Sequence, residues 1–167
     1  MYNSGLFAIF VDMSTKRGNP FPFLEWYRPG LGIHGGFRLD KDDIPLETNG
    51  KGGVYIIETT NGFHFPYPDG KSSVIYIGES ENLMTRLKEH RQTLWKLQEN
   101  QDYGMKPSQP WISSRYQYML YKGARVYYYP AIGNQSPKEM EAEIIWNFYK
   151  FYRALPVGNA AKSYSRK

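Results

Sequence analysis

The chain has 167 residues, no cysteine and a formal net charge of +5, from 21 Lys and Arg against 16 Asp and Glu. A length of this order predicts one domain with its own core, and the absence of cysteine excludes disulfide frameworks, thiolate nucleophiles and metal sites with Cys ligands. No segment approaches the ~20 consecutive apolar residues that span a bilayer, and the first residues lack the charged start of a secretory signal. We therefore expect a cytoplasmic protein without a membrane partner.

The positive charge is unevenly distributed along the chain. Residues 1–50 hold 5 basic and 6 acidic side chains, residues 51–102 hold 6 and 7, and residues 103–167 hold 10 and 3. Such an asymmetry is typical of a nucleic-acid-binding face, and an ordinary solvated surface explains it equally well.

Residues 1–50 are rich in glycine, proline and aromatic side chains, as in Asn19-Pro20-Phe21-Pro22-Phe23. Glycine and proline at this density break helices and long strands, whereas the aromatic content argues against disorder. The pattern predicts an irregular N-terminal extension of short strands and turns, laid over the core and part of the same domain.

Two buried strands are predicted next, over residues 52–57 and 73–77. Both are runs of β-branched and aromatic residues, the first entered through glycines and the second ended by Gly78. Between them, Asn61-Gly62 predicts a hairpin turn and Pro68-Asp69-Gly70 a second turn.

The remaining segments favour helices and one more strand. Ser80 can cap a helix from Glu81 to about residue 97, with a buried leucine stripe. Another helix over residues 112–122 and a third strand over 125–129 follow. Ser136, Pro137 and Glu139 then form the capping pattern of a last helix that runs to about residue 155.

These elements predict an α+β fold, with a small central antiparallel sheet of three strands flanked by helices. The N-terminal extension occupies residues 1–50, the core residues 51–160 and a basic tail residues 161–167.

An ordered series of residues runs through the core. It comprises Gly53-Val54-Tyr55 on one strand, Tyr76-Ile77-Gly78 on the next, Asn82, Leu83, Arg86 and His90 on the following helix, one glutamate of the last helix, and Asn159 after Pro156. The series resembles the GIY-YIG endonuclease superfamily over about residues 51–160, and the first 50 residues lie outside the resemblance.

Helical spacing is compatible with this series. Arg86 and His90 are four residues apart and share one helix face, which the leucines beside them turn toward the sheet. Tyr55 and Tyr76 can project from the sheet toward the same helix. Each residue also has an ordinary interpretation: half-buried strand tyrosines, a surface histidine, and an arginine paired with Glu89.

The resemblance implies a metal-dependent DNA endonuclease. Tyr55 would activate the attacking water or act as its base, and His90 would accept the proton. Arg86 would neutralise charge on the scissile phosphate. Tyr76 would position the phosphate or the water, and Asn159 would support the site by hydrogen bonding.

The metal ligand is a choice among three glutamates of the last helix. Glu139 already serves the predicted cap, Glu141 lies at the edge of the apolar face, and Glu143 lies on a mixed face. The family pattern, a glutamate three residues before an apolar pair, favours Glu141 and leaves Glu143 as the alternative. One carboxylate with several waters suits Mg²⁺, or Mn²⁺ in its place.

Two spacings depart from the family. Twenty residues separate Tyr55 from Tyr76, and Asn159 follows Glu141 by 18. Both gaps are longer than those usual in the family, and residues 63–71 supply the excess in the first.

The sequence shows no evident zinc finger or helix-turn-helix beside this core. In this respect the chain resembles the restriction-enzyme branch of the superfamily. A type II restriction-like enzyme would cut double-stranded DNA, and such enzymes often act as homodimers to address both strands. Residues 15–40, residues 92–111 and the basic last third would then read DNA, with Lys88, Arg91 and Arg115 as DNA-binding candidates. The alternatives are a structure-selective or nonspecific repair or phage nuclease, and a non-catalytic nucleic-acid-binding module of the same fold.

Overall fold

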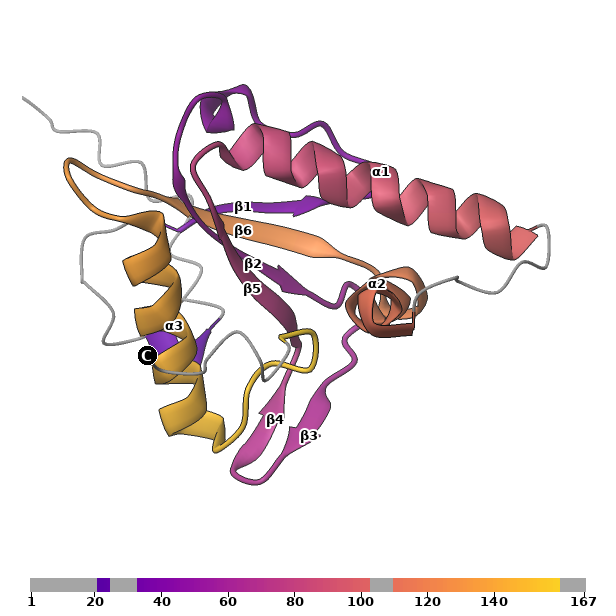
Figure 1. The fold of residues 1–167 in the computed structure, drawn as a ribbon. Coiled ribbons are helices and arrows are strands. Elements are labelled where there is room, and N and C mark those ends of the chain that lie inside the picture. The colour runs from indigo at the N-terminus through magenta and orange to yellow at the C-terminus, as the bar shows by residue number, and fades with distance from the viewer. Residues whose placement is uncertain (1–20, 25–32, 103–109, 160–167) are drawn as a thin grey trace, which may run out of the picture.

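The computed structural model describes residues 21–24, 33–102 and 110–159 (Figure 1). The elements are, in chain order, the 3-10 helix η1 (Pro22–Leu24), strand β1 (His34–Arg38), the 3-10 helix η2 (Leu46–Thr48), strands β2 (Gly53–Glu58), β3 (Phe65–Tyr67), β4 (Gly70–Ser72) and β5 (Val74–Ser80), helices α1 (Leu83–Asp102) and α2 (Pro110–Lys122), strand β6 (Arg125–Pro130) and helix α3 (Pro137–Tyr152).

The main sheet is antiparallel with the strand order β1-β6-β2-β5. Every residue of β2 is buried because the strand is paired on both edges and covered on both faces. The α+β class is confirmed, but the main sheet has four strands where three were predicted. The extra strand, β1, comes from the N-terminal extension.

Strand β1 has the sequence His-Gly-Gly-Phe-Arg, which lacks the β-branched residues that mark a strand. Its pairing with β6 depends on Gly35, whose φ is +106° and whose Cβ, if present, would lie 2.6 Å from the carbonyl oxygen of Val126. Tertiary pairing therefore forms this strand against its local propensity.

Helices cover both faces of the main sheet (Figure 1). Helix α3 and η1 pack on one face through a cluster that includes Val54, Ile56, Ile77, Ile144 and Phe148. Helices α1 and α2 pack on the other face, around Tyr55, Leu83, Leu87 and Met119. Among the described residues no helix is both long and apolar enough to cross a membrane, since α1 reaches 20 residues but is polar.

The segment between the two motif strands forms a second sheet of its own. Strands β3 and β4 pair with each other around the turn predicted at Pro68-Asp69-Gly70. The hairpin predicted at Asn61-Gly62 is wrong: this dipeptide lies in a bend after β2, and β3 pairs with β4 instead of β2.

Several helix limits also differ from the predictions. Ser80 is the last residue of β5 and does not cap α1; the side chain of Asn82 accepts the N–H of Thr85 instead. Helix α1 extends to Asp102, and α2 begins at Pro110.

The predicted cap of α3 is confirmed, because the Ser136 side chain accepts the N–H of Glu139. This helix ends at Tyr152, three residues before the predicted end. Arg153 then adopts a left-handed conformation with φ of 58° and closes the last turn with a hydrogen bond to Tyr149.

Candidate active site

The two motif tyrosines lie on the same face of the sheet. Tyr55 is paired with Gly78 and Ile57 with Tyr76, so the tyrosines occupy diagonal positions and their ring centroids are 6.0 Å apart. A β-bulge between β2 and β5 adds Ile75 to this face as well. Both phenols therefore face helices α1 and α2, as the sequence predicted.

The motif glycines allow this arrangement for steric reasons. A Cβ at Gly78 would lie 2.5 Å from the hydroxyl oxygen of Tyr55 and 2.6 Å from the ring of Tyr76. A Cβ at Gly53 would lie 2.2 Å from the carbonyl oxygen of Tyr129. Neither position can hold a larger residue without displacing backbone or a site ring.

His90 is fully buried and hydrogen-bonded at both ring nitrogens. Its Nε2 lies 2.8 Å from the hydroxyl of Tyr55, and its Nδ1 lies 2.8 Å from the hydroxyl of Tyr116. Burial, followed by the positive charges of Arg86 and Arg115, lowers the pKa of His90 to about 3. The imidazole is therefore neutral at physiological pH and links two phenols through one donor and one acceptor.

Tyr55 is equally uncharged. Burial, with a further contribution from Tyr76, raises the pKa of its phenol well above the ordinary value, although Arg86 and Arg115 act in the opposite direction. All three groups of the hydrogen-bonded chain Tyr55–His90–Tyr116 are therefore neutral at physiological pH, and none of them is a strong base.

Arg86 borders this chain from α1. Its guanidinium forms an ion pair with Glu89 at 2.8 Å, the ordinary interpretation of this residue, and both side chains are well exposed. The positive charge of Arg86 nevertheless lowers the pKa of Tyr55, against the larger effect of burial. Arg86 is therefore paired with Glu89 and also close enough to the buried phenol to influence it.

Arg115 and Tyr116 complete the site from α2. The guanidinium carbon of Arg115 lies 4.1 Å from the ring centroid of Tyr76, and the hydroxyl of Tyr116 reaches His90. Sequence reasoning offered Arg115 only as a DNA-binding candidate and did not consider Tyr116. No spacing in the sequence relates α2 to the motif, so packing alone reveals this contribution.

Glu141 and Glu143 differ in their surroundings. Glu141 is partly buried, and burial followed by the negative charge of Glu79 raises the pKa of its carboxyl to about 7, which Arg115 counteracts. Glu143 is exposed. The face of α3 that turns toward β5 therefore carries Glu141 and not its neighbour.

A divalent ion fits this carboxylate chemically. A carboxylate whose pKa is raised by burial and by a neighbouring negative charge gains from a bound hard cation, and Mg²⁺ needs only one or two carboxylates beside water and substrate oxygens. Glu141 is the candidate ligand and Glu79 the nearby second carboxylate. No group of three or more His, Asp or Glu residues converges among the described residues.

Asn159 holds the backbone of β5. Its side-chain oxygen accepts the N–H of Ile77 at 3.0 Å, and its amide donates to the carbonyl of Ile77 at 2.8 Å. These two bonds fix the strand beside Tyr76, so Asn159 acts on the position of the tyrosine.

The other two DNA-binding candidates lie on α1. Arg91 donates to the carbonyl of Leu39 at 2.6 Å and to that of Asp42, and thereby ties the loop after β1 to the helix. Lys88 is exposed. Of the regions expected to read DNA, residues 15–20, 25–32 and 103–109 lie outside the described residues, as does the tail 161–167.

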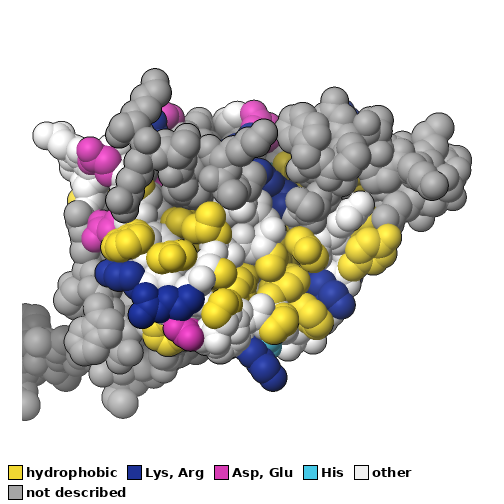
Figure 2. Space-filling model, turned by 60° about the horizontal axis from the view of Figure 1, so that its bottom comes forward, with side chains coloured by type: hydrophobic (Ala, Val, Ile, Leu, Met, Phe, Trp, Pro, Cys, Tyr) yellow, Lys and Arg dark blue, Asp and Glu magenta, His cyan; other side chains and the backbone are white. Residues whose placement is uncertain are grey.

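Much of the described positive charge of the last third makes internal contacts. Arg125 pairs with Glu58 at 3.6 Å, Arg153 pairs with Asp69 at 3.2 Å, and the Lys122 ammonium lies 4.2 Å from the Phe63 ring centroid. Figure 2, which views the side where β3 and β4 lie, shows Lys and Arg scattered among hydrophobic side chains. The described residues form no continuous basic stripe in this view.

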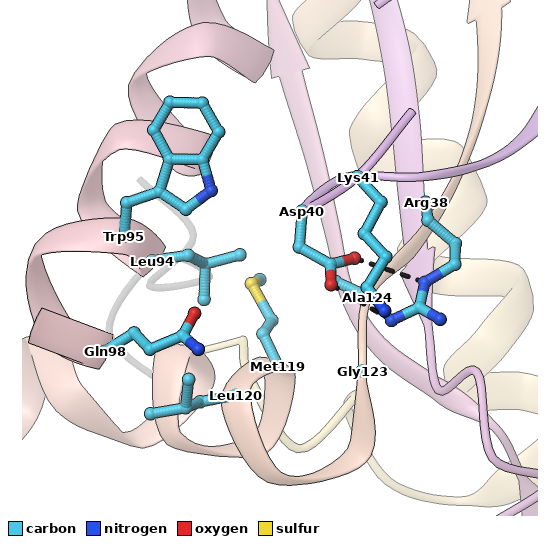
Figure 3. Close-up of a pocket in the computed structure, with 10 residues that line it drawn as sticks. All are labelled: Arg38, Asp40, Lys41, Leu94, Trp95, Gln98, Met119, Leu120, Gly123 and Ala124. Carbon is cyan, nitrogen blue, oxygen red and sulfur yellow. Dashed lines mark hydrogen bonds and ion pairs between the residues drawn. The ribbon is translucent and has the colours of Figure 1, made fainter. Parts of the chain in front are cut away.

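A cavity of about 240 Å³ lies between α1, α2 and the loop after β1 (Figure 3). Leu94 and Met119 line it together with Trp95 and Gln98, and the bidentate pair of Arg38 with Asp40 lies at its other side. None of the tyrosines, His90 or Glu141 lines this cavity, so it is separate from the candidate active site.

Comparison with known families gives one match, to the GIY-YIG catalytic domain over residues 51–147, which is more than half of the chain. This range includes both motif strands, α1, α2 and Glu141, and ends before Asn159. No curated protein and no solved structure matches the chain.

Proposed function

The chain belongs to the GIY-YIG nuclease superfamily, and we propose that it is a metal-dependent endonuclease that hydrolyses phosphodiester bonds of double-stranded DNA. The observation that carries this proposal is the convergence of Tyr55, Tyr76, His90 and two arginines. Glu141 on α3 lies within electrostatic reach of one of these arginines, Arg115. Hydrolysis of a phosphodiester needs a proton acceptor for water, cations for the developing charge and a carboxylate that can hold a metal.

Tyr55 orients the attacking water in this mechanism. When its hydroxyl donates to Nε2 of His90, the phenolic oxygen keeps lone pairs that accept a hydrogen bond from water. As the water attacks phosphorus, its proton passes to the Tyr55 oxygen while the Tyr55 proton passes to Nε2.

His90 acts as a relay, because its low pKa disfavours a lasting imidazolium. As Nε2 gains a proton, the Nδ1 proton passes to the oxygen of Tyr116, which releases its own proton toward solvent. His90 thus passes a proton from Tyr55 to Tyr116 and is not the final proton acceptor.

Arg86 balances charge on the phosphate, and Tyr76 and Asn159 keep the phosphate-facing wall in place. Glu141, with Glu79 near it, would hold the divalent ion. Nucleases of this family generally use such an ion. Bound Mg²⁺ or Mn²⁺ would stabilise charge on the leaving oxygen. Glu143 stays the alternative ligand.

The finer role we propose is that of a type II restriction-like enzyme that acts as a homodimer. Strand β1, from the N-terminal extension, and the β3–β4 hairpin, inserted between the motif strands, support it, because such additions to the nuclease core resemble the restriction-enzyme branch. Lys88 and Arg115 are the candidates for phosphate contacts, whereas the carbonyl contacts of Arg91 argue for a structural role.

The test incubates the protein with plasmid and phage DNA, with Mg²⁺ and with chelator. Discrete fragments that depend on Mg²⁺ support the restriction-like enzyme, and smears or nicks support a nonspecific or structure-selective nuclease. Binding without any product indicates a non-catalytic module and contradicts the proposed mechanism.

A further inference from the structure

We propose that Arg115 is a second catalytic cation, which contacts the scissile phosphate with its free edge while the ring of Tyr76 holds its face. This inference rests on the proposed nuclease function and extends it to α2, outside the motif strands and the motif helix.

The stacking geometry leaves the hydrogen-bonding edge of Arg115 available. Its guanidinium carbon is 4.1 Å from the Tyr76 centroid, so the ring takes up the face of the group. The donors of a guanidinium lie in its plane and match the oxygens of a phosphate. Arg115 takes part in none of the ion pairs of residues 21–24, 33–102 and 110–159, whereas Arg86 is paired with Glu89.

The base of the Arg115 side chain is fixed by close packing. A Cβ at Gly158 would lie 3.0 Å from Cβ of Arg115 and 2.6 Å from the carbonyl oxygen of Ile75. The N–H of Gly158 donates to that same carbonyl at 2.7 Å. The segment after α3 thus clamps α2 against β5 and presets the direction in which Arg115 leaves the helix.

Arg115 lies close to the buried chain of hydrogen-bonded rings. Its guanidinium stacks on Tyr76, and the ring centroid of Tyr76 is 6.0 Å from that of Tyr55 and 6.0 Å from that of His90. The charge of Arg115 accordingly lowers the pKa of His90, after burial and Arg86. A phosphate held against the water-activating phenol would therefore lie next to Arg115.

This position distinguishes Arg115 from a cation that merely tracks the DNA backbone. A tracking cation affects affinity and its salt dependence, whereas a cation on the reacting phosphate affects the chemical step. The distinction can be measured with protein in excess over DNA.

The experiment uses the full chain and measures the single-turnover rate constant for plasmid cleavage in Mg²⁺, and the Kd for the same DNA in Ca²⁺. The variants are Arg115→Gln, Arg115→Lys and Arg115→Ala. Lys71→Gln is the control, because it removes one positive charge from an exposed position on β4. Thermal unfolding is recorded for each variant.

We expect Arg115→Gln to lower the rate constant about 10²- to 10³-fold, the usual effect of removing one donor that stabilises a transition state. The Kd should change by no more than about threefold, as for Lys71→Gln. Arg115→Lys should retain an intermediate rate, because the charge remains without the planar fork. Added methylguanidinium should restore part of the rate of Arg115→Ala, which a purely structural role would not allow.

The inference is overturned if Arg115→Gln and Arg115→Lys cleave at the wild-type rate, or if they lose only affinity. A loss of rate that accompanies a lower unfolding temperature in both variants, without guanidinium rescue, assigns Arg115 to packing. If the wild-type protein cleaves no DNA at all, the proposed function itself fails, a result distinct from a variant that cleaves normally.

Discussion

Replacing Glu141 by Gln removes a carboxylate whose ionised form lowers the free energy of unfolding. Burial, and secondly Glu79, raise the pKa of this group from 4.5 to about 7. Each pH unit of difference between folded and unfolded pKa corresponds to about 1.4 kcal/mol. At pH 8, ionised Glu141 therefore costs about 3 kcal/mol of unfolding free energy, an upper value because solvent reaches part of the side chain.

The sign of the pH dependence follows from the raised pKa. The folded state binds the proton more tightly than the unfolded state, so the stabilisation is complete below pH 4.5 and is lost as the pH rises through about 7. Relative to the variant, the wild-type protein should lose about 1–3 kcal/mol between pH 4.5 and pH 8. The Gln variant lacks this contribution.

Urea denaturation of both proteins at pH 4.5, 6 and 8, in chelator, measures the difference. We expect similar stabilities at pH 4.5 and a more stable Glu141→Gln at pH 8. Mg²⁺ should stabilise only the wild-type protein. Parallel pH profiles, or equal stabilisation of both proteins by Mg²⁺, would refute the assignment of a strained metal-binding carboxylate to Glu141.

Three further predictions concern the remaining parts of the site. Tyr116→Phe leaves Nδ1 of His90 without its partner, so we expect cleavage to fall at least tenfold and stability by about 1–3 kcal/mol; unchanged single-turnover rates would contradict the relay. Gly78→Ala should destabilise the fold by about 1–3 kcal/mol in thermal unfolding, since its Cβ would meet Tyr55. Gly133→Ala is the control, because its Cβ would meet no other atom and it adds only backbone strain at a positive φ. Arg91→Ala should lower stability by about 1–3 kcal/mol through the loss of two carbonyl contacts, with the Kd for DNA unchanged; a large loss of affinity at full stability would instead indicate a DNA contact.

The parts of the fold that local sequence determines were predictable. The motif strands are apolar runs bounded by glycine, and the cap of α3 uses side chains adjacent in sequence. Strand β1 was not predictable, because two glycines weaken its strand propensity and its partner β6 lies about 90 residues further along the sequence. Ser80 illustrates a related error, since a good capping residue was taken up by the end of β5.

The candidate site divides in the same way. The convergence of Tyr55, Tyr76 and His90 follows from strand alternation and helical spacing, which sequence reasoning handles well. Arg115 and Tyr116 belong to a helix whose packing against β5 no periodicity specifies. The low pKa of His90 likewise depends on complete burial and two arginines from different helices, which only the folded chain brings together.

The most direct test of the nuclease assignment is cleavage of supercoiled plasmid by the wild-type protein and by Glu141→Gln, each with Mg²⁺. We predict nicked or linear products from the wild-type protein only, while both proteins retain binding of the plasmid in Ca²⁺. Binding by the wild-type protein without cleavage, or cleavage by Glu141→Gln at the wild-type rate, would contradict a metal-dependent nuclease built on this site.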